Sequence, residues 1–198
     1  ITVDQMAEVT RGVRNVVADD VYITVGIPGG FTEIVPKPLY DEDFIKMSYA
    51  GADGLHTHKS SIEDLEALVN SAHKYGLLVD AYIGMATDLH TFGIPAGTPE
   101  EVYRVAKEME NIGADMIGLM TGMSYEGVDA GQIHPLIRER LQALVGAVKV
   151  PTLAEGGINI TNFKAFKDTK VNILVIGTAI DNMVEKAAQE AVQQFLNI

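Results

Sequence analysis

The stretch Pro151-Thr-Leu-Ala-Glu-Gly-Gly-Ile158 is a short apolar run that ends in two glycines, and Val171-Asn-Ile-Leu-Val-Ile-Gly-Thr-Ala-Ile180 repeats the pattern. Each run predicts a buried parallel strand, because such a strand is covered by helices on both faces and shows no polar alternation. A helical pattern follows each glycine turn. Two such units in succession are typical of the last two strands of a (β/α)8 barrel.

The glycine turns predict a phosphate site at Gly156, Gly157 and Gly177. Glycine has no Cβ, so its backbone N–H can approach an anion closely. The helix after each turn directs the positive end of its dipole to the same place. The alternative is that these glycines only make tight strand-to-helix turns. Two glycine turns in tandem favour the phosphate site.

The composition indicates a globular protein with an acidic surface. Of 198 residues, 47% are hydrophobic and 21% are charged, so the chain can form a sizeable core. The net charge of -12 argues against nucleic acid and anionic membranes as partners. Cysteine is absent, which excludes disulfides and thiolate chemistry. Because we find neither an apolar run of ~18 residues nor a signal peptide, we expect a soluble cytoplasmic protein.

Helical and strand patterns alternate along the whole chain, which predicts an α/β fold with a parallel sheet. We expect one domain over residues 1–198, a TIM (β/α)8-type barrel that is either complete or lacks its first strands. Only about six strands are predicted, against eight in a closed barrel. The predicted helices cover about 3–18, 41–50, 61–75, 98–112, 134–148, 160–167 and 182–196, and the strands cover 21–25, 53–56, 77–83, 116–120, 150–154 and 173–176.

Chemistry in a barrel lies where strands end, and those positions give a short list of candidates. Glu155 follows an apolar strand and immediately precedes a glycine turn, so partial desolvation would suit it to proton transfer. A carboxylate that only stabilises the start of a helix is the alternative. Asp80 interrupts an apolar strand, and buried carboxylates are rarely without partners. Glu155, Asp80 and His56 are the predicted catalytic residues.

His56 and His58 flank a single residue, so in a strand they face the same side. With a carboxylate from a neighbouring strand, Asp80 or Glu155, they could hold a divalent metal. We take His56, His58 and Asp80 as the predicted ligands of a metal such as Mg²⁺. Two polar residues on a solvated loop are the alternative. Further polar candidates stand on the loops: Lys59, Asp88, His90, Thr91, Tyr125, Glu126 and Asp129.

Several of these segments resemble one enzyme superfamily. Gly113-Ala-Asp-Met-Ile-Gly-Leu-Met-Thr-Gly122, Tyr75-Gly-Leu-Leu-Val-Asp80, the Glu155-Gly-Gly-Ile158 turn and the run that ends in Gly177-Thr178 are similar to 3-hexulose-6-phosphate synthase and 3-keto-L-gulonate-6-phosphate decarboxylase. These are ribulose-phosphate-binding barrels of the orotidine-monophosphate decarboxylase superfamily. The resemblance implies a phosphate cup formed by Gly156, Gly157, Gly177 and Thr178.

The resemblance has departures that leave the reaction open. The Asp-x-Lys-x-x-Asp motif, which holds magnesium in that family, is missing, since the corresponding strand would be 21–25 followed by Gly26-Ile-Pro-Gly-Gly30. The first expected function is a sugar-phosphate lyase. Ala154-Glu-Gly-Gly157 also resembles N-acetylmannosamine-6-phosphate 2-epimerase, which implies an epimerase that uses Glu155. The third is a phosphosugar-binding protein without catalysis. By analogy we expect a homo-oligomer, a homodimer being the usual case.

Overall fold

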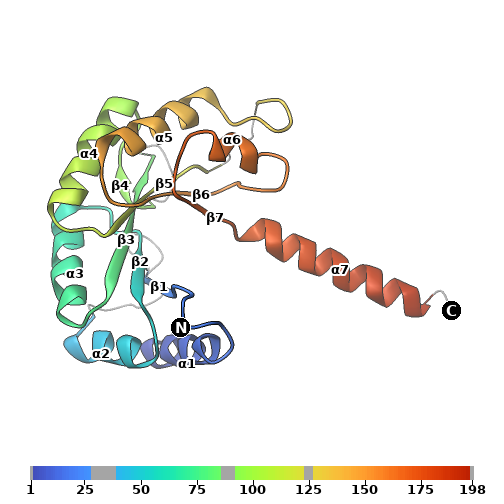
Figure 1. Cartoon of the computed structure of the whole chain (residues 1–198), viewed down its shortest axis with the longest axis horizontal. Helices are drawn as coiled ribbons and strands as arrows, with labels where there is room; N and C mark the ends of the chain where they lie inside the picture. The colour runs from blue at the N-terminus through green and yellow to red at the C-terminus, as the bar shows by residue number, and fades with distance from the viewer. Residues whose placement is uncertain (1, 28–38, 86–91, 123–126, 197–198) are drawn as a thin grey trace.

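The computed structural model describes residues 2–27, 39–85, 92–122 and 127–196. Its strands form one parallel sheet that curls into half of a barrel (Figure 1). The order along the sheet is β1-β2-β3-β5-β6-β7, and the short strand β4 pairs with the end of β3. Strand bounds are β1 Thr24–Ile27, β2 Gly54–Thr57, β3 Leu78–Gly84, β4 Ile94–Pro95, β5 Met116–Met120, β6 Thr152–Glu155 and β7 Ile173–Val175.

Helices alternate with the strands, and α3, α4 and α5 lie along the outer side of the curled sheet (Figure 1). The helix starts are locally encoded, because Ser61 and Thr98 accept hydrogen bonds from backbone amides of their helices and Pro99 occupies the first helical position of α4. Helix bounds are α1 Val3–Arg14, α2 Asp41–Tyr49, α3 Ile62–Lys74, α4 Pro99–Asn111, α5 Pro135–Ala147, α6 Phe163–Lys167 and α7 Thr178–Leu196.

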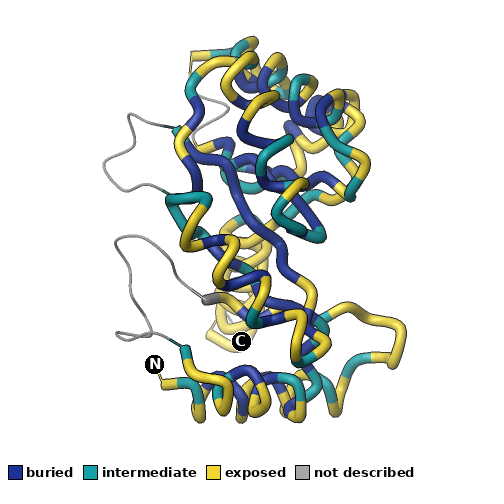
Figure 2. Tube along the Cα trace, turned by 90° about the vertical axis from the view of Figure 1, so that its left-hand side faces the viewer, coloured by how far each residue is buried: buried dark blue, intermediate teal, exposed yellow. Residues whose placement is uncertain are grey.

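The main core lies between the sheet and the outer helices (Figure 2). Alternate strand residues, such as Leu55, Val79 and Ile117, are fully buried against the apolar faces of α3, α4 and α5. The opposite, concave face of the sheet carries a second, smaller apolar cluster of Tyr82, Met116 and Leu153. The predicted catalytic residues His56, Asp80 and Glu155 lie on this concave face, so the fold gathers these three in one place.

Two element boundaries differ from the prediction at the start of the chain. The first helix ends at Arg14 rather than near residue 18, and Val9 and Val16 of its apolar pattern are exposed. The first strand begins at Thr24 rather than at Val21. Its predicted start rested on β-branched and aromatic residues, but Val21 is 42% exposed because it precedes the paired part of the sheet.

The last helix also differs from the prediction. It begins at Thr178, directly after Gly177, and not near Asn182. It extends away from the sheet (Figure 1), and none of its residues, all of which the structure describes, is buried. The apolar positions Met183 and Leu196 are therefore exposed to solvent here. Within the described ranges, no helix combines the length and the apolar character needed to span a bilayer.

Candidate functional site

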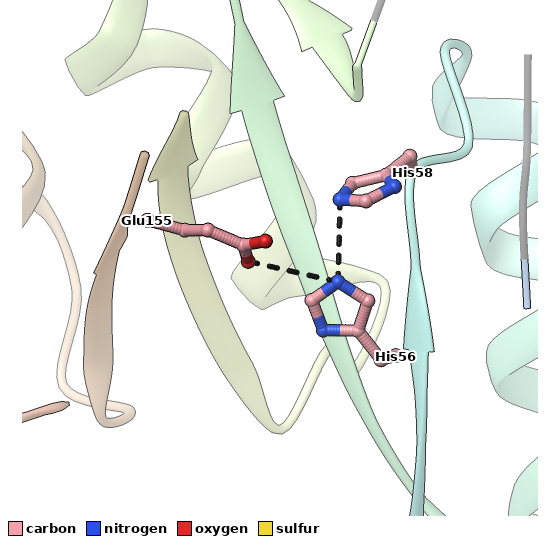
Figure 3. A group of neighbouring side chains, drawn as sticks. All are labelled: His56, His58 and Glu155. Atoms are coloured by element: carbon pink, nitrogen blue, oxygen red, sulfur yellow. Dashed lines mark hydrogen bonds and ion pairs between the residues drawn. The ribbon is translucent and has the colours of Figure 1, made fainter. Parts of the chain in front are cut away.

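The strand register places the predicted catalytic residues on one face of the sheet. His56 of β2 is the direct partner of Asp80 of β3, so their side chains project to the same side. Glu155 ends β6, three strands from β2 in the sheet order. The curvature of the sheet brings its carboxylate back toward His56 (Figure 3). We call His56, His58, Asp80 and Glu155 the histidine cluster.

His56 is held by Asp80. Its Nδ1 lies 2.6 Å from Asp80 Oδ2, and the other oxygen of Asp80 accepts a hydrogen bond of 2.6 Å from the Thr24 hydroxyl. Asp80 is almost fully buried, so this carboxylate is fixed in place. Burial lowers the pKa of His56, but the hydrogen bond and charge of Asp80, and then the charge of Glu155, outweigh it and raise that pKa. The pairing places a proton between His56 Nδ1 and Asp80 and turns Nε2 toward His58 and Glu155.

The second ring nitrogen of His56 faces both His58 and Glu155. The Nε2 atoms of His56 and His58 are 3.2 Å apart, and Glu155 Oε2 lies 3.7 Å from His56 Nε2 (Figure 3). Burial and the charge of His56 lower the pKa of His58 to about 4, although Asp80 opposes this shift. Glu155 Oε2 is buried and, among the described residues, no group donates a hydrogen bond to it.

Tyr82 forms the floor of the cluster. Its ring lies 4.7 Å from the His56 ring and 5.4 Å from the His58 ring, centroid to centroid. Gly118 on β5 makes room for it, since a Cβ at that position would stand 2.3 Å from Tyr82 Cε1. Burial, followed by the nearby carboxylates of Glu155 and Asp80, strongly raises the pKa of the Tyr82 hydroxyl. Tyr82 therefore stays protonated and acts as a rigid neutral wall.

The potential metal ligands differ from the predicted set in their carboxylate. One ligand atom each from His56, His58 and Glu155 lies within 4.8 Å of the others. Asp80, the predicted third ligand, instead hydrogen-bonds the far nitrogen of His56. The physical reason is the strand register. Asp80 is the direct partner of His56 on the neighbouring strand, so its carboxylate reaches Nδ1 and not the side of the ring where Nε2 faces His58. Whether the group binds a metal stays a prediction.

The four residues of the predicted phosphate site line a single cavity of about 490 Å³. We call Gly156, Gly157, Gly177 and Thr178 the glycine cup. Gly156 and Gly157 have φ of 110° and 69°, which residues with a side chain rarely adopt. None of the four backbone N–H groups donates to an acceptor in the part of the chain that the structure describes. With respect to the described residues the cup thus offers four amides without an acceptor, and α7, which starts at Thr178, adds its positive end.

The turn after β6 is tied to the end of β5 by Thr121. Its backbone N–H donates to the Glu155 carbonyl at 2.6 Å, and its hydroxyl lies 2.5 Å from the Gly156 carbonyl. A Cβ on Gly156 would stand only 2.8 Å from the amide nitrogen of Gly122. The two loops therefore pack backbone to backbone, and glycine is required at position 156.

Sequence reasoning missed two polar residues of this cavity, Asn159 and Asn182. Asn182 stands four residues after Thr178, one helical turn further, so an earlier start of the helix would have indicated it. Lys59 does not line this cavity, and its backbone N–H donates a hydrogen bond to the Thr57 hydroxyl. Five loop candidates lie outside the described residues: Asp88, His90, Thr91, Tyr125 and Glu126. The backbone carbonyl of Asp129 accepts a hydrogen bond from the Gln132 N–H.

Comparison with known proteins identifies the fold. No protein-family model matches the chain. The chain is 28% identical over 152 residues to the imidazole glycerol phosphate synthase subunit HisF of Caulobacter vibrioides (strain NA1000 / CB15N), a match that covers 73% of this chain and 54% of that protein. The HisF of a second strain of that organism, ATCC 19089 / CIP 103742 / CB 15, gives the same values. The chain thus spans about half the length of these curated relatives.

Solved structures show the same architecture. A mutant tryptophan synthase alpha-subunit from the hyperthermophile Pyrococcus furiosus superposes with a TM-score of 0.69 at 10% identity, over 96% of this chain and 69% of that one. A thiamine phosphate pyrophosphorylase from Pyrococcus furiosus gives a TM-score of 0.53 at 20% identity, over 88% and 66%. The fold is a TIM-type barrel, as predicted. The narrower resemblance to 3-hexulose-6-phosphate synthase is not confirmed by these matches.

Proposed function

We propose that the protein acts on a small phosphorylated sugar, with the phosphate on the glycine cup and the carbon skeleton at the histidine cluster. One observation carries the proposal: Glu155 belongs to both. It lines the cup cavity together with Gly156 and Gly177, and its Oε2 lies 3.7 Å from His56 Nε2. A substrate anchored by its phosphate would therefore place its next carbons beside an acid–base pair.

The reaction that fits this arrangement is proton transfer next to a carbonyl group. Glu155 can accept a proton through a carboxylate oxygen, while His56, held by Asp80, faces the substrate oxygen on which charge develops. The cavity of about 490 Å³ is in the size range of small-ligand sites. Because the net charge is -12, the phosphate needs these local amides to bind at all.

Of the two enzymatic functions, we favour the carbon–carbon lyase. Glu155 and His56 lie side by side, so both approach the same face of a bound sugar. Inversion at a carbon by two bases needs groups on opposite faces, whereas cleavage needs one base for a hydroxyl proton and one acid for the carbon left behind. The predicted homo-oligomer stays part of this proposal, because β1 and β7 are the outer strands of the described sheet and a second copy would cover an edge.

The buried Glu155 Oε2 argues against the third function, a binding protein without catalysis. A buried carboxylate oxygen that accepts no hydrogen bond from the described residues is costly, and such groups persist mainly at functional sites. A protein that only binds phosphate through the amides of the cup would gain nothing that offsets this loss of stability. Binding alone would be equally well served by a shorter or apolar side chain at this position.

The test combines a substrate panel with one isosteric variant. Pentose and hexose phosphates are incubated with the protein in deuterated water and followed by NMR. We expect cleavage or condensation products, and we expect Glu155→Gln to lower the rate at least ~100-fold, the usual contribution of a general acid or base. Inorganic phosphate should still bind the variant within about threefold. Glu185→Gln, on the exposed helix α7, is the matched control.

Two results would redirect the proposal. Deuterium at a sugar carbon without cleavage would establish the epimerase instead of the lyase. An unchanged rate in Glu155→Gln, or sugar phosphates that neither bind nor react while the protein remains folded, would overturn the proposed function.

A further inference from the structure

We infer that His56, His58 and Glu155 bind a first-row transition-metal ion such as Zn²⁺ or Co²⁺, and not Mg²⁺. The inference deepens the proposed function, because this ion would stand where the substrate oxygens lie if that function is correct. Three electron-pair donors lie close together, they are partly buried, and Asp80 and Thr24 hold His56 in place.

The three donor atoms converge with suitable spacing. A tetrahedral ion with metal–nitrogen distances of ~2.0–2.1 Å separates two ligand atoms by roughly 3.3 Å. The Nε2 atoms of His56 and His58 are 3.2 Å apart, and Glu155 Oε2 is 3.7 Å from His56 Nε2 (Figure 3). The ligand atoms of all three residues lie within 4.8 Å of one another, so they surround one common position.

The three donor atoms face one another in a partly buried place. His56 Nδ1 is engaged by Asp80, so Nε2 is the ring nitrogen that faces His58 and Glu155. The Nε2 atoms of His56 and His58 are within hydrogen-bonding distance of each other, and among the described residues Glu155 Oε2 is buried with no hydrogen-bond partner. A cation in the middle would be a partner for all three atoms. Buried electron-pair donors that point at one common position are the arrangement expected of a metal site.

The residues behind the ligands have the organisation of a second layer. Metal-bound histidines commonly donate their other N–H to a carboxylate, which fixes the ring and strengthens the ligand. Asp80 does this for His56 and is itself fixed by the Thr24 hydroxyl. The rings of Tyr82 and Phe92 stand edge-on to His58, with centroids at 5.4 and 5.5 Å. Asp80 is thus an orienting residue rather than a ligand.

The donor set selects the class of metal. Imidazole nitrogen suits zinc, cobalt, nickel and iron, whereas Mg²⁺ prefers an octahedron of oxygens and keeps several waters. Three protein ligands also leave at least one open position, as in catalytic zinc sites. A carboxylate has two oxygens, so Glu155 could bind the ion through Oε2 and still exchange a proton through Oε1. His56 would then stabilise the substrate oxygen through the ion rather than through its own proton.

The experiment is a metal titration that does not depend on activity. Protein freed of metal with a chelator is titrated with Co²⁺, whose visible absorption reports nitrogen ligands and coordination number, and Zn²⁺ is then used as a competitor. We expect one equivalent of each to bind, and no competition from millimolar Mg²⁺. His58→Ala should weaken Co²⁺ binding at least ~100-fold, and Asp80→Asn by about 10–100-fold. His73→Ala, whose ring contacts Asp115 at the surface, should bind as the parent does.

The outcomes separate this inference from the proposed function. Absence of a one-equivalent Co²⁺ site in the folded parent protein, or Co²⁺ binding that His58→Ala leaves unchanged, overturns the metal site. Unchanged Co²⁺ binding in a Glu155→Ala variant would also overturn the proposed ligand set, without bearing on the proposed function. Tight Co²⁺ binding that depends on His58, together with no response to any sugar phosphate, would retain the metal site and reject the proposed function.

Discussion

The glycine cup and the histidine cluster meet at Glu155, yet they are built in opposite ways. The cup offers backbone amides, and its side chains matter mainly by being absent. The cluster offers side chains from β2, β3 and β6, held by one another and by Thr24. The difference teaches that anchoring and chemistry can change separately: under the proposed function the cup would hold the phosphate group, while the cluster would determine the reaction.

The largest effect on stability should come from a substitution at Gly118, which lies against the Tyr82 ring beneath the histidine cluster. An alanine Cβ there would overlap the Tyr82 ring at 2.3 Å, and Tyr82 is too tightly buried to move aside. We expect Gly118→Ala to lower the free energy of unfolding by about 3 kcal/mol, at the upper end for overpacking. Urea denaturation measures it. Gly146→Ala, where a Cβ meets nothing within 4 Å in helix α5, is the control and should be neutral or slightly stabilising.

A parent-like unfolding curve for Gly118→Ala would show that Tyr82 does not form a rigid floor. In a variant that still folds, inorganic phosphate should bind normally, because the cup does not depend on Tyr82. If the folded variant lost phosphate binding as well as Co²⁺ binding, the glycine cup and the histidine cluster would not be independent of each other.

A smaller effect is expected when the cup is broken at Gly156. Its φ of 110° is unfavourable for alanine, and the added methyl would approach the Gly122 amide nitrogen at 2.8 Å. Gly156→Ala should cost about 2 kcal/mol of stability and weaken inorganic phosphate binding at least ~10-fold, because backbone strain of this kind costs ~1–3 kcal/mol. Calorimetric titration with phosphate measures the binding.

Gly177→Ala is the matched comparison within the cup. A Cβ at Gly177 meets nothing within 4 Å and needs no unusual φ, so stability should stay within ~0.5 kcal/mol of the parent. Equal damage from both substitutions would mean that the methyl group, and not the backbone conformation, matters. Co²⁺ binding at the cluster should survive in both variants.

The smallest effect concerns the hydrogen bond between Thr24 and Asp80. Thr24→Val keeps the shape but removes the donor, 2.6 Å from Asp80 Oδ1, and should cost about 1 kcal/mol of stability. Thr24→Ser keeps the hydroxyl and should recover most of it. Thermal unfolding of the pair measures the difference, and a serine variant as unstable as the valine variant would show that the methyl group, not the hydrogen bond, is what counts.

The same contrast explains what the sequence could predict. The strand Met116–Met120 and the start of α4 at Thr98 and Pro99 were predicted correctly, because apolar runs, caps and prolines are local signals. The cup residues were named together for the same reason, since glycine turns at strand ends are visible in the sequence. Val21 and Tyr22 were wrongly assigned to the first strand, because β-propensity does not reveal where pairing begins.

The grouping of the cluster could not be predicted in full. His56 and His58 are two residues apart, so their shared face follows from the strand period. The choice between Asp80 and Glu155 as the third ligand depends on sheet order, register and curvature. Glu155 lies three strands from His56 and reaches it only because the sheet curls, whereas Asp80 is adjacent and contacts the far nitrogen instead.

Thr121 has a consequence for the direction of the cup amides. It holds the carbonyls of Glu155 and Gly156 toward the end of β5. In a trans peptide the C=O and the N–H of one unit point in opposite directions, so the N–H groups of Gly156 and Gly157 are turned the other way. Thr121, which does not line the cavity, thereby determines the direction in which the N–H groups of Gly156 and Gly157 point.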